Sequence, residues 1–300
     1  MKAAAVLLML GFVLPSAVQA QRVRCPARPS RPVRFKPNSC SFSATPQEQA
    51  KCLLRKVRPY GELDVRPLEQ LPPPLDTLVG QTISISKEAL RQYLAGRGIS
   101  ETDLGGSLDQ PLSKSTAGEA ARYFIIHDTS SLLPGSAFPT NINDASWPGN
   151  RFNGFLHPKN RDGTPARVVA HVFVNRLGQS ATGVNFNTAW FTTKYEVENR
   201  ADRLGLFIGI EMIQPRLNDR RGIDAIAPEP GFPDSQLDRL ALVYTAASVR
   251  AGKWMIPVFH AAVDEGLCDA HDDPQNFDLS LWATRLRGLL TELGVDLGGI

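Results

Sequence analysis

LGLFIGIEMI, residues 204–213, is the stretch around which the fold can be predicted, because it is short, almost wholly apolar and rich in β-forming residues. Three further segments share this character: ARYFIIH (121–127), ARVVAHVFV (166–174) and KWMIPVFH (253–260). Apolar runs of this length predict strands buried in a sheet. The sequence therefore predicts four core strands after Gly118.

Helical patterns separate and follow these strands. In SQLDRLALVYTAASVRAG (235–252) the apolar residues recur at three and four positions, which predicts a long helix that ends at Gly252. SLWATRLRGLLTELG (280–294) predicts a final helix. Since strands and helices alternate, we expect an α/β (α+β) fold with a mixed central β-sheet flanked by helices.

The first 20 residues have the pattern of a secretory signal peptide. Lys2 precedes an apolar run, and the segment ends in the small-residue sequence SAVQA, which places cleavage after Ala20. The apolar run is too short to span a bilayer, and no later stretch approaches the roughly 20 apolar residues that a membrane helix needs. We expect export to the periplasm or the medium and no membrane span.

A Pro-rich segment, residues 21–80, follows. It contains one clear helix signal, with Thr45 as N-cap, and then an extended connector over 58–78. The segment is either an ordered wrap pinned by disulfides or a small accessory element. Ser86 predicts the start of another helix that closes at Gly96.

Cysteines and charge restrict the remaining classes. Four cysteines in an exported chain favour two disulfides with three possible connectivities, and they lack the paired spacing of a zinc cage: Cys25, Cys40, Cys52 and Cys268. A net charge of +3 gives no reason to expect nucleic acid as a partner. Residues 21–47 carry basic residues and no acidic one, which fits an anionic wall or membrane surface, or a solvated arm.

A long irregular segment from Asp128 to about Gly163 carries Pro, Gly, Asn and aromatic residues without a sustained period. Loops of this length in compact domains are usually functional or disordered. We interpret the segment as a wall of an active-site cleft, and a flexible surface excursion is the alternative.

Candidate metal ligands stand at strand ends. His127 and His260 close two predicted strands, and Asp273 follows His260 by thirteen residues in a loop before the last helix. Two imidazoles and one carboxylate leave one tetrahedral position of zinc for water, which is the ligand count of a catalytic site. Glu211 interrupts an apolar strand, so it is either a general base or the partner of Arg216 or Arg203.

Four blocks together resemble the type 2 N-acetylmuramoyl-L-alanine amidases, whose fold is shared with phage lysozyme-type amidases and peptidoglycan recognition proteins. In order they are YFIIHDTSS (123–131), AHVFVNRLGQ (170–179), GLFIGIEMI (205–213) and HAAVDEGLCDAHDDPQNFD (260–278). The resemblance covers the core 118–294 and implies a zinc amidase domain over 81–300. It also implies that zinc is bound by His127, His260 and Asp273, with Glu211 handling the proton.

One position departs from the family pattern. His271 stands where the family usually has a lysine that stabilises the oxyanion. A histidine can do this when protonated, or donate a hydrogen bond when neutral, and it could instead compete with Asp273 as a zinc ligand. We expect His171 to be structural or to line the substrate site, and His157, in the long loop, to have no role or to touch substrate.

The resemblance implies hydrolysis of the amide between the muramic acid lactyl group and L-Ala of the stem peptide, with peptidoglycan or muropeptides as substrate. Two alternatives stay open. One is a non-catalytic peptidoglycan-binding module on the same fold, and the other is metal-dependent hydrolysis of a different amide. The sequence carries no indication of the oligomeric state.

Overall fold

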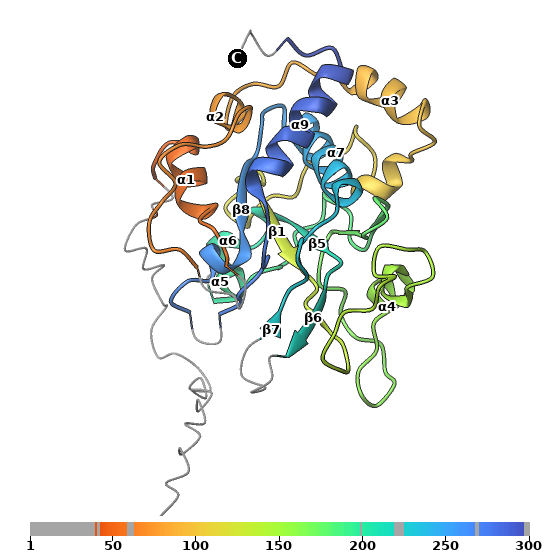
Figure 1. Cartoon of the computed structure of the whole chain (residues 1–300). Helices are drawn as coiled ribbons and strands as arrows, with labels where there is room; N and C mark the ends of the chain where they lie inside the picture. Colours follow the sequence, from red (N-terminus) through yellow and green to blue (C-terminus); the bar gives the residue numbers. More distant parts are fainter. Residues whose placement is uncertain are drawn as a thin grey trace, which may run out of the picture.

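A five-stranded mixed sheet forms the centre of the molecule, in the order β4-β3-β5-β1-β8 (Figure 1). The computed structural model describes residues 40, 43–58, 63–198, 200–218, 225–267 and 270–296. Helices flank the sheet, so the predicted fold class is confirmed. The strands are β1 (Tyr123–Asp128), β3 (Val172–Val174), β4 (Ser180–Thr182), β5 (Phe207–Met212) and β8 (Ile256–Phe259).

The four predicted strands are present and lie parallel to one another. β1 pairs with β5 on one side and with β8 on the other, and β3 pairs with β5. All six residues of β1 are buried. Parallel strands are usually covered on both faces of the sheet, and this explains why the sequence of β1 is a nearly continuous apolar run. β4 returns antiparallel to β3 after a turn in which Gly178 has a φ of 76°.

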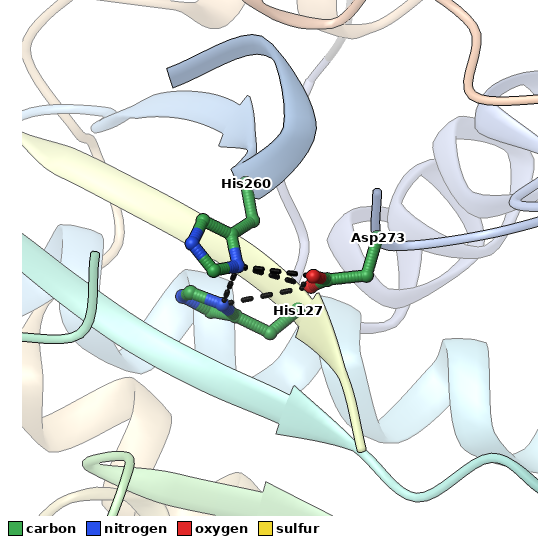
Figure 2. Close-up of side chains that lie close together, drawn as sticks. All are labelled: His127, His260 and Asp273. Carbon is green, nitrogen blue, oxygen red and sulfur yellow. Dashed lines mark hydrogen bonds and ion pairs between the residues drawn. The ribbon is translucent and has the colours of Figure 1, made fainter. Parts of the chain in front are cut away.

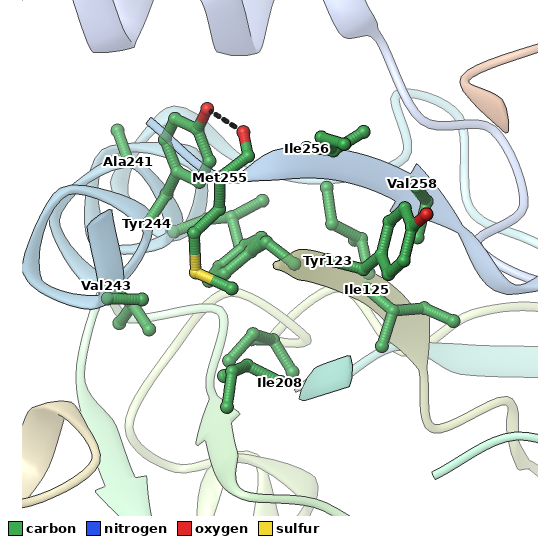
Figure 3. Close-up of a cluster of buried hydrophobic side chains, with 14 of the residues drawn as sticks. Tyr123, Ile125, Ile208, Ala241, Val243, Tyr244, Met255, Ile256 and Val258 are labelled. Carbon is green, nitrogen blue, oxygen red and sulfur yellow. Dashed lines mark hydrogen bonds between the residues drawn. The ribbon is translucent and has the colours of Figure 1, made fainter. Parts of the chain in front are cut away.

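Two long helices cover one face of the sheet. They are α7 (Asp234–Ala251), which ends at Gly252 as predicted, and α9 (Leu279–Glu292). The two helices lie side by side (Figure 1). Phe124 of β1 meets Tyr244 of α7 edge to face, and the Tyr244 hydroxyl donates to the carbonyl of Met255 at 2.7 Å (Figure 3). Burial of these apolar side chains is the main stabilising contribution.

The N-terminal segment covers the opposite face. Tyr123, next to Phe124 on β1 and so on the other side of the sheet, donates its hydroxyl proton to Gln49 Oε1 at 2.7 Å. Gln49 belongs to α1 (Pro46–Leu53), which begins with a capping box between Thr45 and Glu48. The helix predicted after Thr45 is therefore confirmed.

Residues 40–80 share the main hydrophobic core. Ala50, Leu53 and Leu75 are fully buried in the same cluster as the strands. Arg55, also buried, pairs with Glu265 at 2.6 Å and so ties the segment to the second half of the domain. In the described residues this segment is a wrap on the sheet domain rather than a separate element. The helix predicted from Ser86 is α3 (Lys87–Ala95), with Ser86 as its cap.

Short elements complete the fold, and the sequence did not predict them. β2 (Ser131–Leu132), β6 (Pro215–Asn218) and β7 (Ala225–Ile226) form a second sheet. Segments of two to four residues are too short to show a period. The remaining elements are α2 (Leu75–Leu78), η2 (Glu101–Leu104), η3 (Pro148–Asn150), α4 (Asn153–Leu156), α5 (Lys194–Glu198), α6 (Arg200–Arg203) and α8 (His260–Val263). Within the described residues, none of the helices has the length and apolarity needed to cross a membrane.

The long loop after β1 is ordered by its own aromatic residues. Trp147 and Ile142 are buried against Ile213, and Phe152 and Phe155 pack around them. These side chains form a small second core, so the loop is not a flexible excursion. Its contribution to a pocket is described with the site.

One predicted disulfide is present, between Cys40 and Cys52. Cys25 and Cys268 lie outside the described residues, so the second predicted disulfide stays a prediction. The Cys40–Cys52 bond joins the first described residue to α1, the helix through which the N-terminal wrap packs on β8.

Replacing both cysteines of this bond, Cys40→Ala with Cys52→Ala, should lower the free energy of unfolding. The bond closes a loop with a sequence separation of 12, and closure of loops of this size stabilises by about 3 kcal/mol. Equilibrium urea unfolding under oxidising conditions measures the change. An unchanged midpoint and slope would show that the bond contributes nothing to the fold.

Candidate metal centre

Three polar residues meet at one edge of the sheet because their strands run parallel. His127 of β1 lies directly opposite Glu211 of β5. On the other side, Ile126 is paired with Phe259, and the next residue along β8 is His260, the first residue of α8. Parallel strands bring their carboxyl ends to the same edge, which is where open α/β sheets bind ligands.

The two histidines and Asp273 converge closely (Figure 2). The Nδ1 atoms of His127 and His260 are 2.8 Å apart. Asp273 Oδ1 lies 3.0 Å from His260 Nδ1, and Asp273 Oδ2 lies 3.6 Å from His127 Nδ1. The exposed fractions of the three residues are only 2–3%. Residues far apart in the sequence thus present three donor atoms to one point.

These donors can hold a metal ion. The ligand atoms of a tetrahedral zinc site lie roughly 3.3 Å apart, since each bond is about 2.0–2.1 Å long. With Asp273 Oδ2 as the carboxylate ligand, the three distances between donor atoms are 2.8, 3.3 and 3.6 Å, which are close to that spacing. Two imidazole nitrogens and one carboxylate suit Zn²⁺ and leave one position for water or substrate.

Asp273 is held in place by the backbone of neighbouring segments. The Ala261 N–H donates to the Asp273 carbonyl at 2.8 Å, and the Asp128 N–H donates to Asp273 Oδ2 at 3.1 Å. The Asp128 carboxylate in turn accepts from the Gln275 N–H at 2.8 Å and from Ser130. Two aspartates, one at the end of β1 and one in the loop before α9, therefore lock that loop against the sheet.

Burial and neighbouring charges set the protonation of the cluster. Burial, followed by the charge of His260, lowers the pKa of His127 well below its usual value. Burial alone would also lower the pKa of His260, but Asp273 and Asp264 raise it to about 10. A proton on His260 thus occupies the region between the donors in competition with a metal ion, because metal binding needs neutral imidazoles.

Glu211 lies in the same pocket, and none of the described residues forms an ion pair with it. Its Oε2 is buried and has no hydrogen-bond partner among the described residues. Burial, and then the charges of Asp273 and Asp128, raise the pKa of Glu211 well above its usual value. The salt-bridge alternative with Arg216 is wrong, because Arg216 pairs with Asp272 at 3.1 Å. A carboxyl group in this environment suits proton transfer.

His271 lies at the mouth of the site. Its side chain is 53% exposed, its ring is 4.5 Å from the His260 ring between centroids, and its Nδ1 is 3.6 Å from Asp273 Oδ1. Asp273, not His271, forms the compact buried group with the two histidines. The exposed ring can reach a group bound in the pocket.

The other two histidines lie away from the donors. His171 is fully buried; its Nε2–H donates to the Thr188 carbonyl at 3.1 Å, and its Nδ1 accepts from the Gly209 N–H at 3.0 Å. Burial lowers its pKa to about 4, so it stays neutral and joins β3 to β5. His157 is exposed and does not line the pocket.

Two site residues were missed in the sequence. Asp264 is fully buried and accepts from His260 Nε2 at 2.8 Å, and burial raises the pKa of Asp128 to about 7 beside Asp273. The spacing of four between His260 and Asp264 was the available signal, since residues four apart meet on a helix. Asp128 gave no signal beyond its place next to His127.

The donors open into a pocket of about 910 Å³. Its lining has a polar part, with Ser130, Arg216 and Asp272. The lining also has an apolar part, with Val169 and Val197, whose exposed fractions are 52% and 51%. Only Asp128, Thr129, Ser130 and Phe155 of the long loop line the pocket. Trp147 and Phe152 instead serve the small core beneath it.

Comparisons with known proteins add one distant likeness. No model of a known protein family matches the chain, and no curated protein matches it. Among solved structures it is similar to the Ph2119 endolysin from Thermus scotoductus MAT2119 bacteriophage Ph2119. The identity is 15% and the TM-score 0.32, over 56% of this chain and 86% of the endolysin chain. So loose a superposition carries no argument about function, and the case rests on the residues of the site.

Substitutions at Asp273 and His271 should distinguish the residue that binds the metal from the residue that only lies next to it. Asp273→Ala removes a buried donor atom and should abolish tight zinc binding, whereas His271→Ala removes an exposed ring and should keep close to one zinc per chain. Elemental analysis after dialysis against zinc-free buffer measures both. Loss of zinc from His271→Ala, with zinc retained in Asp273→Ala, would exchange the two roles.

Proposed function

We propose that this protein is an exported, zinc-dependent N-acetylmuramoyl-L-alanine amidase, which hydrolyses the amide between the muramic acid lactyl group and L-Ala of peptidoglycan. The observation that carries the proposal is the convergence of His127, His260 and Asp273 in one pocket beside Glu211, whose Oε2 has no hydrogen-bond partner in the part of the chain that the structure describes. A metal-ligand set with an open position and an adjacent proton acceptor is the equipment of a metal-assisted hydrolase.

The residues divide the chemistry among them. Zn²⁺ bound by the three donors would act as a Lewis acid and lower the pKa of a water molecule to about 7. Glu211 accepts a proton from the attacking water and passes it to the leaving amine nitrogen of L-Ala. His271 donates a hydrogen bond to the oxygen of the scissile carbonyl as negative charge develops there.

The substrate class follows from the sequence blocks and is compatible with the pocket. The blocks around His127, Glu211 and His260 resemble the amidase family in order and spacing. The pocket volume of about 910 Å³ is at the upper end of the usual range for small-molecule sites. Its apolar lining residues Val169 and Val197 can pack against the carbon skeleton of a muropeptide, while its polar lining residues contact hydroxyl and carboxylate groups.

Digestion of purified peptidoglycan tests the proposal. Residues 21–300, loaded with zinc, should release stem peptides with a free amino-terminal L-Ala and leave the glycan strands intact. Chelator should stop the release, and added zinc should restore it. Mass spectrometry identifies the new ends. Cleavage within the peptide would indicate a different amide, and binding to peptidoglycan without any cleavage would indicate a binding module.

Glu211→Gln should keep zinc and lose turnover. Glutamine preserves the size of the side chain but cannot accept the proton from water, and general base catalysis is typically worth about 10²–10⁴-fold in rate. Elemental analysis and the peptidoglycan assay measure the two effects. Glu119→Gln is the control, since Glu119 is exposed and precedes the opposite end of β1. A rate close to that of the wild type in Glu211→Gln would place the base elsewhere.

A further inference from the structure

Both ring nitrogens of His260 are engaged in the buried cluster. Nδ1 faces His127 Nδ1 at 2.8 Å and Asp273 Oδ1 at 3.0 Å. Nε2, on the far side of the ring, is 2.8 Å from Asp264 Oδ2. When Nε2 carries the proton and donates a hydrogen bond to Asp264, Nδ1 has a free lone pair that points at the other metal-donor atoms. The partner of the distal nitrogen therefore decides which nitrogen can ligate a metal ion.

The same Asp264 carboxylate holds a wall of the pocket. It accepts from the Lys194 N–H at 3.1 Å and from the Tyr195 N–H at 3.0 Å, at the first residues of α5. Lys194 and Val197 of this helix line the pocket. α5 is only five residues long, so its position depends on contacts of this kind rather than on its own stability.

We propose that Asp264 is a positioning residue, which keeps His260 in the tautomer that ligates through Nδ1 and fixes the α5 wall of the pocket with the same carboxylate. This rests on the proposed function for its metal, but it concerns binding and not the reaction. Asp264 does not contact the point at which the three metal-donor atoms meet. It acts through His260 and through the backbone of α5.

The geometry explains why a carboxylate is required at this position. Asp264 is fully buried and offers only acceptors, and three donors point at it: one ring N–H and two backbone N–H groups. An asparagine of the same size has one oxygen and one NH₂ group. If its oxygen takes the place of Oδ2, that oxygen serves both His260 and the Lys194 N–H, but its NH₂ group then opposes the Tyr195 N–H. If its NH₂ group faces His260, Nε2 must accept, and the ring proton moves to Nδ1.

Asp264→Asn should therefore weaken zinc binding, measured by competition with a chromophoric chelator, by about 10–100-fold. Hydrogen exchange at the Lys194 and Tyr195 amides should become faster as their acceptor is disturbed. Asp162→Asn is the matched control, because it makes the same change at an exposed aspartate that bonds Thr164 and does not line the pocket. It should leave both the zinc affinity and these two amides unchanged. Wild-type zinc affinity in folded Asp264→Asn would overturn the proposal.

A second measurement does not depend on the variant folding. In the zinc-loaded wild type labelled with ¹⁵N-histidine, His260 should show a proton on Nε2 that exchanges slowly, since it is buried against Asp264. A proton on Nδ1, or a rapidly exchanging Nε2–H, would refute the assignment, as would failure of the wild type to bind zinc at all. Zinc binding with the expected Nε2–H, but no release of L-alanyl peptides, would leave Asp264 in its role and refute the amidase function instead.

Discussion

The geometry of the candidate metal centre depends on the parallel register between β1 and its two neighbours. Because side chains alternate along a strand, a slip of one residue between β1 and β5 would move His127 to the face covered by α7 and separate it from Glu211. The apolar residues before His127 prevent such a slip, since Phe124 must face Tyr244 of α7 and Tyr123 must face Gln49 of α1. Packing of the core thus fixes the register on which the polar contacts of the site depend.

The same edge of the sheet gathers acidic groups at a high desolvation cost. Asp128, Asp264, Asp273 and Glu211 lie around two buried histidines, and the negative charges of Asp273 and Asp128 raise the pKa of Glu211 further. Backbone N–H groups and His260 compensate the aspartates, but Glu211 Oε2 has no partner among the described residues. A divalent cation beside Asp273 would relieve the repulsion among these carboxyl groups, which is a physical reason for the cluster to retain one.

The sequence predicted those parts of this arrangement that show either a regular pattern of apolar residues or a polar residue at or near the end of such a pattern. The four apolar runs became strands β1, β3, β5 and β8, and the polar residues that ended or interrupted them, His127, Glu211 and His260, meet at one sheet edge. Asp264 was missed, because its only sequence signal was the spacing of four from His260, and its other two partners are amides some seventy residues away. The aromatic residues of the long loop were assigned to the cleft wall, but burial against Ile213 draws Trp147 and Phe152 into a separate core.

The site depends on contacts of the N-terminal wrap as well as on the strands that carry the site residues. α1 packs on β8 and α8, the elements on either side of the point where His260 begins. Arg55, just after α1, donates to the Cys52 carbonyl and to Glu265, the residue that follows Asp264. Since Arg55 is buried, loss of Glu265 would leave an unpaired charge in the core, and the chain around Asp264 would have to adjust. The wrap therefore supports the segment that orients His260, so the metal centre and residues 46–55 belong to one structural unit.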